Sequence, residues 1–197
     1  MNFEITKFPI IIFSNYRTGS TALGHYLSKK TGLEYVNEPI YRKIDFDALM
    51  SYRNSGNKNY ILNFMADHAE QDNFYKTILE EDSFKIKLKR QNKIDQISSY
   101  YIAAMTNTWI TEKSNIINDY SVQLDKDVLR QSFRRILHND MLIDSCKVNF
   151  DLSLTYEELG FLEGIHLKLT VPPKNINAVK NLVKVLLKSK FIEELNI

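Results

Sequence analysis

The 197-residue sequence has little of what builds disulfide frameworks or flexible linkers, with one cysteine, six glycines and four prolines. Cys146 has no second cysteine with which to form an internal disulfide, and disulfide frameworks belong to oxidising compartments. Glycine and proline are too sparse to mark a boundary between domains, and no repeat is present. These absences predict a single domain over residues 1–197, in a protein of the reducing cytoplasm.

Excess charge and long apolar runs are also lacking. Lysine and arginine number 26 against 24 aspartates and glutamates, a net charge of +2, which does not favour nucleic acid as a partner. No apolar run approaches the ~20 residues that span a bilayer, and residues 1–10 hold no run typical of a signal peptide. The four histidines and the single cysteine show no metal-ligand spacing. We therefore expect no membrane span and no metal requirement, and any anion site must be local.

Strand and helix patterns alternate along the chain. The run FPIIIF at residues 8–13 is typical of a central parallel strand, and residues 20–32 have helical spacing with a glycine stop. Further strands are predicted at 60–65, 84–88 and 152–155, and further helices at 74–79, 94–105, 128–141 and 175–187. Thr155 and Glu158 have capping-box spacing, and the last helix is expected to pack on the sheet. The fold class predicted is α/β, a single three-layer domain with a mainly parallel central sheet.

The first strand and helix are joined by the polar segment SNYRTGSTA, residues 14–22. Gly19 lets an anion approach the positive end of the helix, Ser20 and Thr21 offer hydroxyl donors, and Arg17 offers a planar donor fork. A nucleotide triphosphatase would show GxxxxGK[ST], but the first glycine is absent and Ser20 replaces the lysine. The segment therefore favours a phosphate or sulfonate site over ATP or GTP with magnesium. The alternative is a turn that only caps the helix.

The run Arg17–Thr18–Gly19–Ser20–Thr21 after an apolar strand resembles the 5′-phosphosulfate loop of sulfotransferases. These enzymes use 3′-phosphoadenosine 5′-phosphosulfate (PAPS) as the sulfonate donor. Carbohydrate and tyrosine sulfotransferases commonly carry arginine at the first of these positions, whereas cytosolic members usually carry lysine. The resemblance implies a P-loop-like fold in which these five residues bind the phosphosulfate.

Two further segments resemble the same family. Arg90 and Ser98, eight residues apart, match the arginine and serine that recognise the 3′-phosphate of PAPS, and a strand end followed by a helix suits that role. Tyr156 opens YEEL, which resembles the family's YEDL segment, whose tyrosine approaches the nucleotide. The resemblance spans roughly residues 8–160. The C-terminal Arg-Lys-Gly loop of cytosolic members is not recognisable, and Trp109, expected on the helix after Ser98, does not match their adenine-stacking tryptophan.

Sulfonate transfer needs a general base for the acceptor and positive charge at the leaving phosphate. The resemblance implies that Arg17 supplies charge, and it offers two candidate bases. Glu38 lies in YVNEPIY, which resembles the Glu-Pro segment of bacterial and carbohydrate sulfotransferases. His68 precedes Arg90 by 22 residues, as in cytosolic members, but the lysine that usually precedes that histidine is missing. Glu38 is the favoured base.

The predicted function is transfer of a sulfonate group from PAPS to a hydroxyl or amine of a small-molecule or carbohydrate acceptor, with adenosine 3′,5′-bisphosphate as the product. One alternative is a P-loop-like kinase or other phosphoryl transferase, which would need ATP and magnesium. Another is a non-catalytic nucleotide-binding protein. Neither the acceptor nor the oligomeric state follows from the sequence.

Overall fold

The structure is a computed structural model that describes residues 4–39, 43–109, 121–160 and 173–188. Contacts within the chain group into two compact units. The first consists of residues 1–91 and 139–167, and the second of residues 92–138 and 168–197. The expectation of one domain over residues 1–197 stays a prediction.

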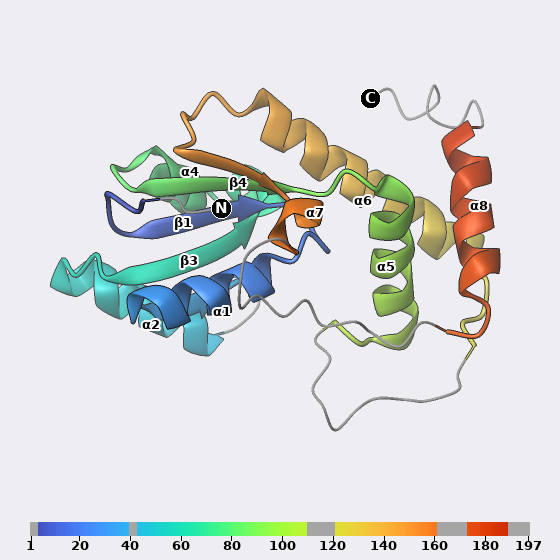
Figure 1. The fold of residues 1–197 in the computed structure, drawn as a ribbon, viewed down its shortest axis with the longest axis horizontal. Helices are drawn as coiled ribbons and strands as arrows, with labels where there is room; N and C mark the ends of the chain where they lie inside the picture. Colours follow the sequence, from blue (N-terminus) through green and yellow to red (C-terminus); the bar gives the residue numbers. More distant parts are fainter. Residues whose placement is uncertain (1–3, 40–42, 110–120, 161–172, 189–197) are drawn as a thin grey trace. The chain divides into compact units, whose positions relative to one another are not determined.

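The first unit is built on a five-stranded sheet whose neighbouring strands all pair in parallel. The strands are β1 (Ile10–Ser14), β2 (Glu34–Asn37), β3 (Tyr60–Met65), β4 (Phe84–Lys89) and β5 (Leu152–Thr155), in the order β2-β3-β1-β4-β5. Figure 1 shows β1 between β3 and β4. The predicted α/β fold class with a parallel central sheet is confirmed.

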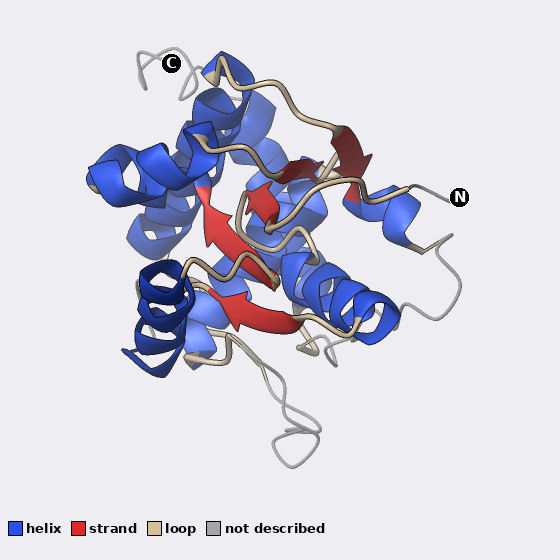
Figure 2. Cartoon of the chain, turned by 90° about the vertical axis from the view of Figure 1, so that its left-hand side faces the viewer, coloured by secondary structure: helices blue, strands red, loops and turns tan. Residues whose placement is uncertain are grey.

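Helices cover both faces of this sheet, and Figure 2 shows the strands lying between helices. They are α1 (Ser20–Thr31), α2 (Lys43–Ser55), α3 (Ala66–Gln71), α4 (Asn73–Glu80) and α7 (Tyr156–Leu159). Residues of α1 and α7 pack with Ile10 and Ile12 on one face. Residues of α2 and α4 pack with Ile11 and Phe13 on the other. Alternate side chains of β1 therefore enter two cores, which explains why its sequence is continuously apolar.

Helix α1 lies close to the sheet because Gly24 has no side chain. A Cβ built at Gly24 would lie 2.2 Å from the ring of Tyr35 on β2, a distance that no real contact allows. The helix ends where expected, with Gly32 in the left-handed conformation (φ 74°) and its N–H bonded to the Ser28 carbonyl. Gly24 thus lets α1 pack closely against β2.

The second unit contains α5 (Lys93–Thr106), the first part of α6 (Lys126–Ser145) and α8 (Ile176–Lys188). Helix α8 packs against α5, with Val179 and Val183 buried and an ion pair of 2.7 Å between Lys180 Nζ and Asp95 Oδ1. The apolar face of α8, expected on the sheet, thus makes its main contacts with α5. Trp109 was expected on this helix, but α5 ends before it, at a left-handed Asn107.

Sequence periodicity located most of these elements. The strand predicted at 60–65 and the helix beginning at residue 20 match the structure. The capping box is present, since Glu158 N donates to Thr155 Oγ1 at 3.3 Å and Thr155 N donates to Glu158 Oε2 at 2.7 Å. Strand β2 and helices α2 and α3 were not predicted. No helix among the described residues is long and apolar enough to cross a membrane.

The strand order indicates where a ligand site is expected. After β1 the chain moves to β2 on one side of the sheet, whereas after β4 it continues to β5 on the other side. In parallel α/β sheets, ligands bind outside the carboxyl ends of neighbouring strands whose connections diverge in this way. Here those strands are β1 and β4.

Candidate functional site

The loop after β1, residues 15–19 (the β1–α1 loop), presents backbone to the start of α1. Gly19 is the N-cap residue of α1, in a left-handed conformation (φ 80°), and makes no side-chain cap. Thr18 is buried, and its Oγ1 donates to the Asn15 carbonyl at 2.7 Å, which closes the loop on itself. Arg17 is also left-handed (φ 59°), a conformation that costs a non-glycine residue about 1 kcal/mol or more. Strained backbone of this kind clusters at functional sites.

Tyr156 and Leu159 of α7 lie directly over Gly19. A Cβ at that position would be 3.0 Å from Leu159 Cδ1 and 3.0 Å from Tyr156 Cδ2. Glycine is therefore required twice, for its positive φ and for the close approach of α7. This contact places Tyr156, the last of the three sequence matches, at the β1–α1 loop.

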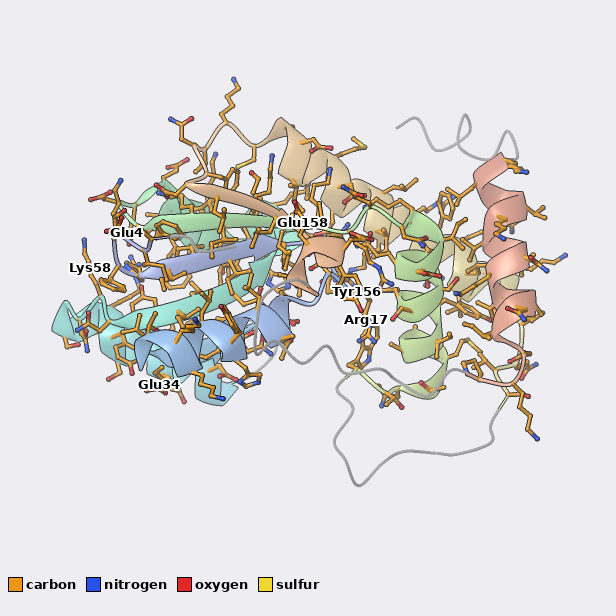
Figure 3. All side chains as sticks on the ribbon, viewed as in Figure 1. Glu4, Arg17, Glu34, Lys58, Tyr156 and Glu158 are labelled. Carbon is orange, nitrogen blue, oxygen red and sulfur yellow. The ribbon has the colours of Figure 1, made fainter. Side chains whose placement is uncertain are left out.

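Arg90 reaches the same loop from the end of β4. Its Nη1 donates to the Arg17 carbonyl at 3.3 Å, and its guanidinium lies 4.1 Å from the centre of the Tyr156 ring. Figure 3 shows Arg17 and Tyr156 at the end of the sheet opposite Glu4 and Lys58. Segments from β1, β4 and α7 thus meet where the strand order predicts a ligand site.

The two arginines bring two guanidinium groups to this end of the sheet. Burial lowers the pKa of the Arg17 guanidinium below its ordinary value, and the charge of Arg90 lowers it further. Tyr156 and Glu38 act in the opposite direction. A bound dianion would also oppose the repulsion between the arginines, so the site is suited to phosphate or sulfonate oxygens.

Glu38 follows β2 at the same end of the sheet. Its backbone is left-handed (φ 47°), and its N–H donates to the Asn63 carbonyl at 2.9 Å. Its charge acts on both Arg17 and Tyr35. Burial raises the pKa of the Tyr35 phenol well above its ordinary value and the charge of Glu38 adds to this rise, whereas hydrogen bonds with Thr21 and Asn63 oppose it. Glu38 is half-buried and lies within electrostatic range of the arginine site.

Ser20 and Thr21 begin α1 and are tied to the neighbouring strands. Asn63 Nδ2 donates to Ser20 Oγ at 3.3 Å, and Thr21 is hydrogen-bonded to Tyr35. These bonds connect the start of α1 with β3 and β2. They hold the first helical turn, whose N–H groups point out of the helix terminus, where anions bind.

His68 occupies a different environment from the other candidate base. Its ring is fully buried, and Nδ1 accepts from the Met65 N–H at 3.3 Å, which caps α3. The Tyr16 hydroxyl donates its one hydrogen to the carboxylate of the neighbouring Asp67, with Oδ2 at 3.1 Å and Oδ1 at 3.2 Å. A histidine whose Nδ1 accepts carries its proton on Nε2 when neutral. Its position inside the protein favours a structural role.

Ser98 lies on α5 in the second unit. It is 1% exposed, and its hydroxyl has no hydrogen-bond partner within the described part of the chain. Such orphaned buried hydroxyls are rare in folded proteins. Its assignment to the 3′-phosphate stays a prediction. In the segment HLKLTVPPK, Lys168 and Lys174 are the two lysines that could substitute for the missing C-terminal loop; Lys174 is exposed, and Lys168 lies outside the described residues.

The sequence analysis missed two buried groups that hold the site. Asn15 Nδ2 donates to Asp140 Oδ1 on α6 at 2.9 Å, and Asn63 binds both Ser20 and Asn37. Asn63 stands out in the sequence as the one polar residue of the strand YILNFM. A polar side chain in a buried strand must find partners, and here they are the start of α1 and the end of β2.

Among the described residues, no group of three His, Cys, Asp or Glu side chains is placed to hold a metal ion. No protein-family model matches the chain, and no curated protein matches it. Membership of the sulfotransferase family therefore stays a prediction from the sequence motifs.

Proposed function

We propose that this protein transfers a sulfonate group from PAPS to a hydroxyl or amine of a small-molecule or carbohydrate acceptor. The observation that carries the proposal is that Arg17, which follows β1, and Arg90, which follows β4, meet beside Gly19 at the N-terminus of α1. Two guanidinium groups and a helix terminus together form a site for a multiply charged anion.

Each charged group of the sulfonate donor PAPS can be assigned to residues of this site. The 5′-phosphosulfate is assigned to Arg17, Thr18, Gly19, Ser20 and Thr21, through loop N–H groups, hydroxyls and the guanidinium. Arg90 and Ser98 are assigned to the 3′-phosphate, with Tyr156 beside the nucleotide. Thr18 acts indirectly, since its hydroxyl already donates to the Asn15 carbonyl.

The transfer step is an in-line displacement at sulfur. The acceptor oxygen or nitrogen forms a bond to sulfur while the bond from sulfur to the bridging phosphate oxygen breaks and leaves its electron pair on the 5′-phosphate. The acceptor's proton passes to the Glu38 carboxylate, and Arg17 stabilises the charge that develops on the leaving phosphate. The products are the sulfonated acceptor, adenosine 3′,5′-bisphosphate and a proton.

Ligand-induced stabilisation tests the proposal without knowledge of the acceptor. Adenosine 3′,5′-bisphosphate at micromolar concentration should raise the melting temperature in the absence of magnesium, because it binds the native state. Stabilisation by ATP with magnesium but not by the bisphosphate would instead support the phosphoryl transferase. Binding of PAPS with no transfer to a panel of sugars, phenols, sterols and amines would support a non-catalytic binding protein.

Site variants then test the assignment of the 3′-phosphate. Arg90→Ala and Ser98→Ala should each weaken the bisphosphate more than adenosine 5′-phosphate, since only the former carries that group. Lys89→Ala is the matched control, because Lys89 pairs with Asp144 at 2.8 Å and has no assigned ligand contact. Equal losses for both ligands would remove Arg90 and Ser98 from this role.

A further inference from the structure

We infer that Asn63 is a positioning residue that couples the phosphosulfate site to the candidate base. The two parts that it joins are the start of α1, at Ser20, and residues 37–39 after β2, called the Glu38 turn below. The inference rests on the proposed function for its catalytic meaning, but the coupling itself is measurable without any ligand.

The contacts of Asn63 reach both parts of the site. The side-chain Nδ2 donates to Ser20 Oγ at 3.3 Å and to Asn37 Oδ1 at 2.9 Å. Its Oδ1 accepts from Ser14 Oγ at 3.3 Å, and its carbonyl accepts from the Glu38 N–H at 2.9 Å. Asn63 is fully buried on the inner strand β3, so its side-chain bonds lie away from water, where their loss is most costly.

The direction of these bonds defines what Asn63 does to Ser20. Because the amide N–H donates to Ser20 Oγ, it occupies a lone pair of the hydroxyl and leaves the hydroxyl hydrogen to act as a donor. A sulfonate or phosphate oxygen accepts such a hydrogen. Asn63 therefore orients Ser20 as a donor to the bound anion.

The same amide holds the Glu38 turn. Asn37 Oδ1 accepts from both Asn63 Nδ2 and the Tyr35 hydroxyl, the latter at 2.7 Å. The left-handed backbone at Glu38 is strained and persists only where neighbouring bonds fix it. Asn63 supplies two of these bonds, one from its side chain to Asn37 and one from its carbonyl to the Glu38 N–H.

Only a carboxamide of this size meets both needs, since it offers two N–H donors and an oxygen acceptor. Aspartate keeps the shape and the acceptor but loses both donors. Asn63→Asp is therefore the informative substitution, and the first measurement is amide hydrogen exchange in the free protein. Protection of the Glu38 N–H should fall roughly tenfold, the equivalent of one net hydrogen bond. The amide resonances of Ser20 and Thr21 should shift in the same variant.

The core amides of β1 and β4 report general opening in the same spectra. An equal loss of protection there would mean that Asn63 only stabilises the fold, and it would overturn the inference. An unchanged Glu38 amide in a folded Asn63→Asp protein would overturn it as well.

A second variant keeps the test decisive if Asn63→Asp does not fold. Ser20→Ala removes one acceptor of the Asn63 amide and should change the exchange of the Glu38 N–H by several-fold, although Ser20 belongs to another element. Thr18→Ala is the matched control, because the Thr18 hydroxyl lies in the adjacent loop but donates to Asn15. Equal effects of the two variants at Glu38 would show that the coupling does not pass through Asn63.

A double-mutant cycle tests whether Ser20 and Asn63 are also coupled in ligand binding. The quantity measured is the affinity for adenosine 3′,5′-bisphosphate. Ser20→Ala and Asn63→Asp should each weaken binding by roughly tenfold, and the double variant should lose little more than either alone. Asn63→Asp and Arg90→Ala should combine independently. Independent losses for Ser20 and Asn63 would overturn the coupling. If the wild-type protein binds no bisphosphate, the proposed function falls, and the exchange measurements still decide the role of Asn63.

Discussion

Polar groups are accommodated differently at the amino ends and at the carboxyl ends of the parallel strands. These two ends are called the amino edge and the carboxyl edge of the sheet below. At the amino ends of the strands, polar groups form exposed pairs, such as Lys7 Nζ with Asp82 Oδ1 at 3.1 Å, with side chains 47% and 79% exposed. At the carboxyl ends, a set of polar side chains is buried and bonds to other buried side chains or to nearby backbone groups. They are Ser14, Asn15, Thr18, Ser20, Asn37, Asn63, Asp67, His68 and Asp140.

The two ends differ in how much stability is lost when a polar group loses its partner. An exposed ion pair contributes little to the free energy of folding, because water replaces either partner. A buried polar group needs a specific partner at a specific distance, and about 1–3 kcal/mol is lost when that partner is removed. The carboxyl edge also contains Arg17 and Glu38, two non-glycine residues with left-handed backbone. Precise placement of buried polar groups, together with strained backbone, is what a binding site requires.

The largest expected effect is at strand β2, which has a glutamate at each end and so allows the two ends to be compared directly. Glu34 begins the strand and accepts a hydrogen bond from Tyr52 Oη, whereas Glu38 follows its carboxyl end. Glu38→Gln keeps size and hydrogen bonding but removes the base, so turnover should fall by on the order of 10²–10⁴ with donor affinity intact. The measurement is transfer of labelled sulfonate from PAPS to an acceptor found in the panel.

Glu34→Gln is the matched control and should leave turnover unchanged. The new side-chain amide oxygen can still accept from Tyr52, and the position lies at the other edge of the sheet. Full activity of Glu38→Gln would move the base elsewhere. Loss of turnover with intact affinity in His68→Asn would then assign it to His68.

Two glycines provide the second comparison. Gly19 at the carboxyl edge and Gly56 before β3 both have positive φ, 80° and 69°, but nothing lies within 4 Å of a Cβ at Gly56. Gly56→Ala should lower the free energy of unfolding by about 1 kcal/mol from backbone strain alone. Gly19→Ala adds overlap with Tyr156 and Leu159, so its loss should reach about 2–4 kcal/mol. Urea denaturation measures both, and equal losses would show that α7 yields easily.

The smallest expected effect is at the amino edge. A hydrogen bond and the charge of Lys7 lower the pKa of the Asp82 carboxyl below its ordinary value of 3.8. A carboxyl whose pKa falls on folding stabilises the protein above its unfolded pKa, and this contribution is lost as the pH falls through the folded value. Asp82→Asn should therefore lower the urea midpoint slightly near neutral pH, and the difference should vanish as the pH falls below the folded pKa of Asp82. A difference that persists at low pH, or that high salt does not reduce, would contradict a simple exposed pair.

Much of the fold followed from local patterns. The strand at 60–65, the start of α1 and the Thr155–Glu158 cap were predicted because each depends on neighbouring residues only. Strand β2 was missed because EYVN is short and only half apolar, and pairing with β3 stabilises it. Helix α8 was predicted from its apolar face, but a periodic face does not specify its partner, which is α5.

The sequence by itself determined the chemistry that is available at the site. Arg17, the glycine at position 19 and the hydroxyls that follow form one continuous segment, so their proximity needs no tertiary contact. Only the tertiary structure decided that Arg90 and Tyr156 reach this segment and that Asn63 links Ser20 to the Glu38 turn. These contacts join residues from separate strands. Strand order and register create them, and both are set by packing of the whole sheet.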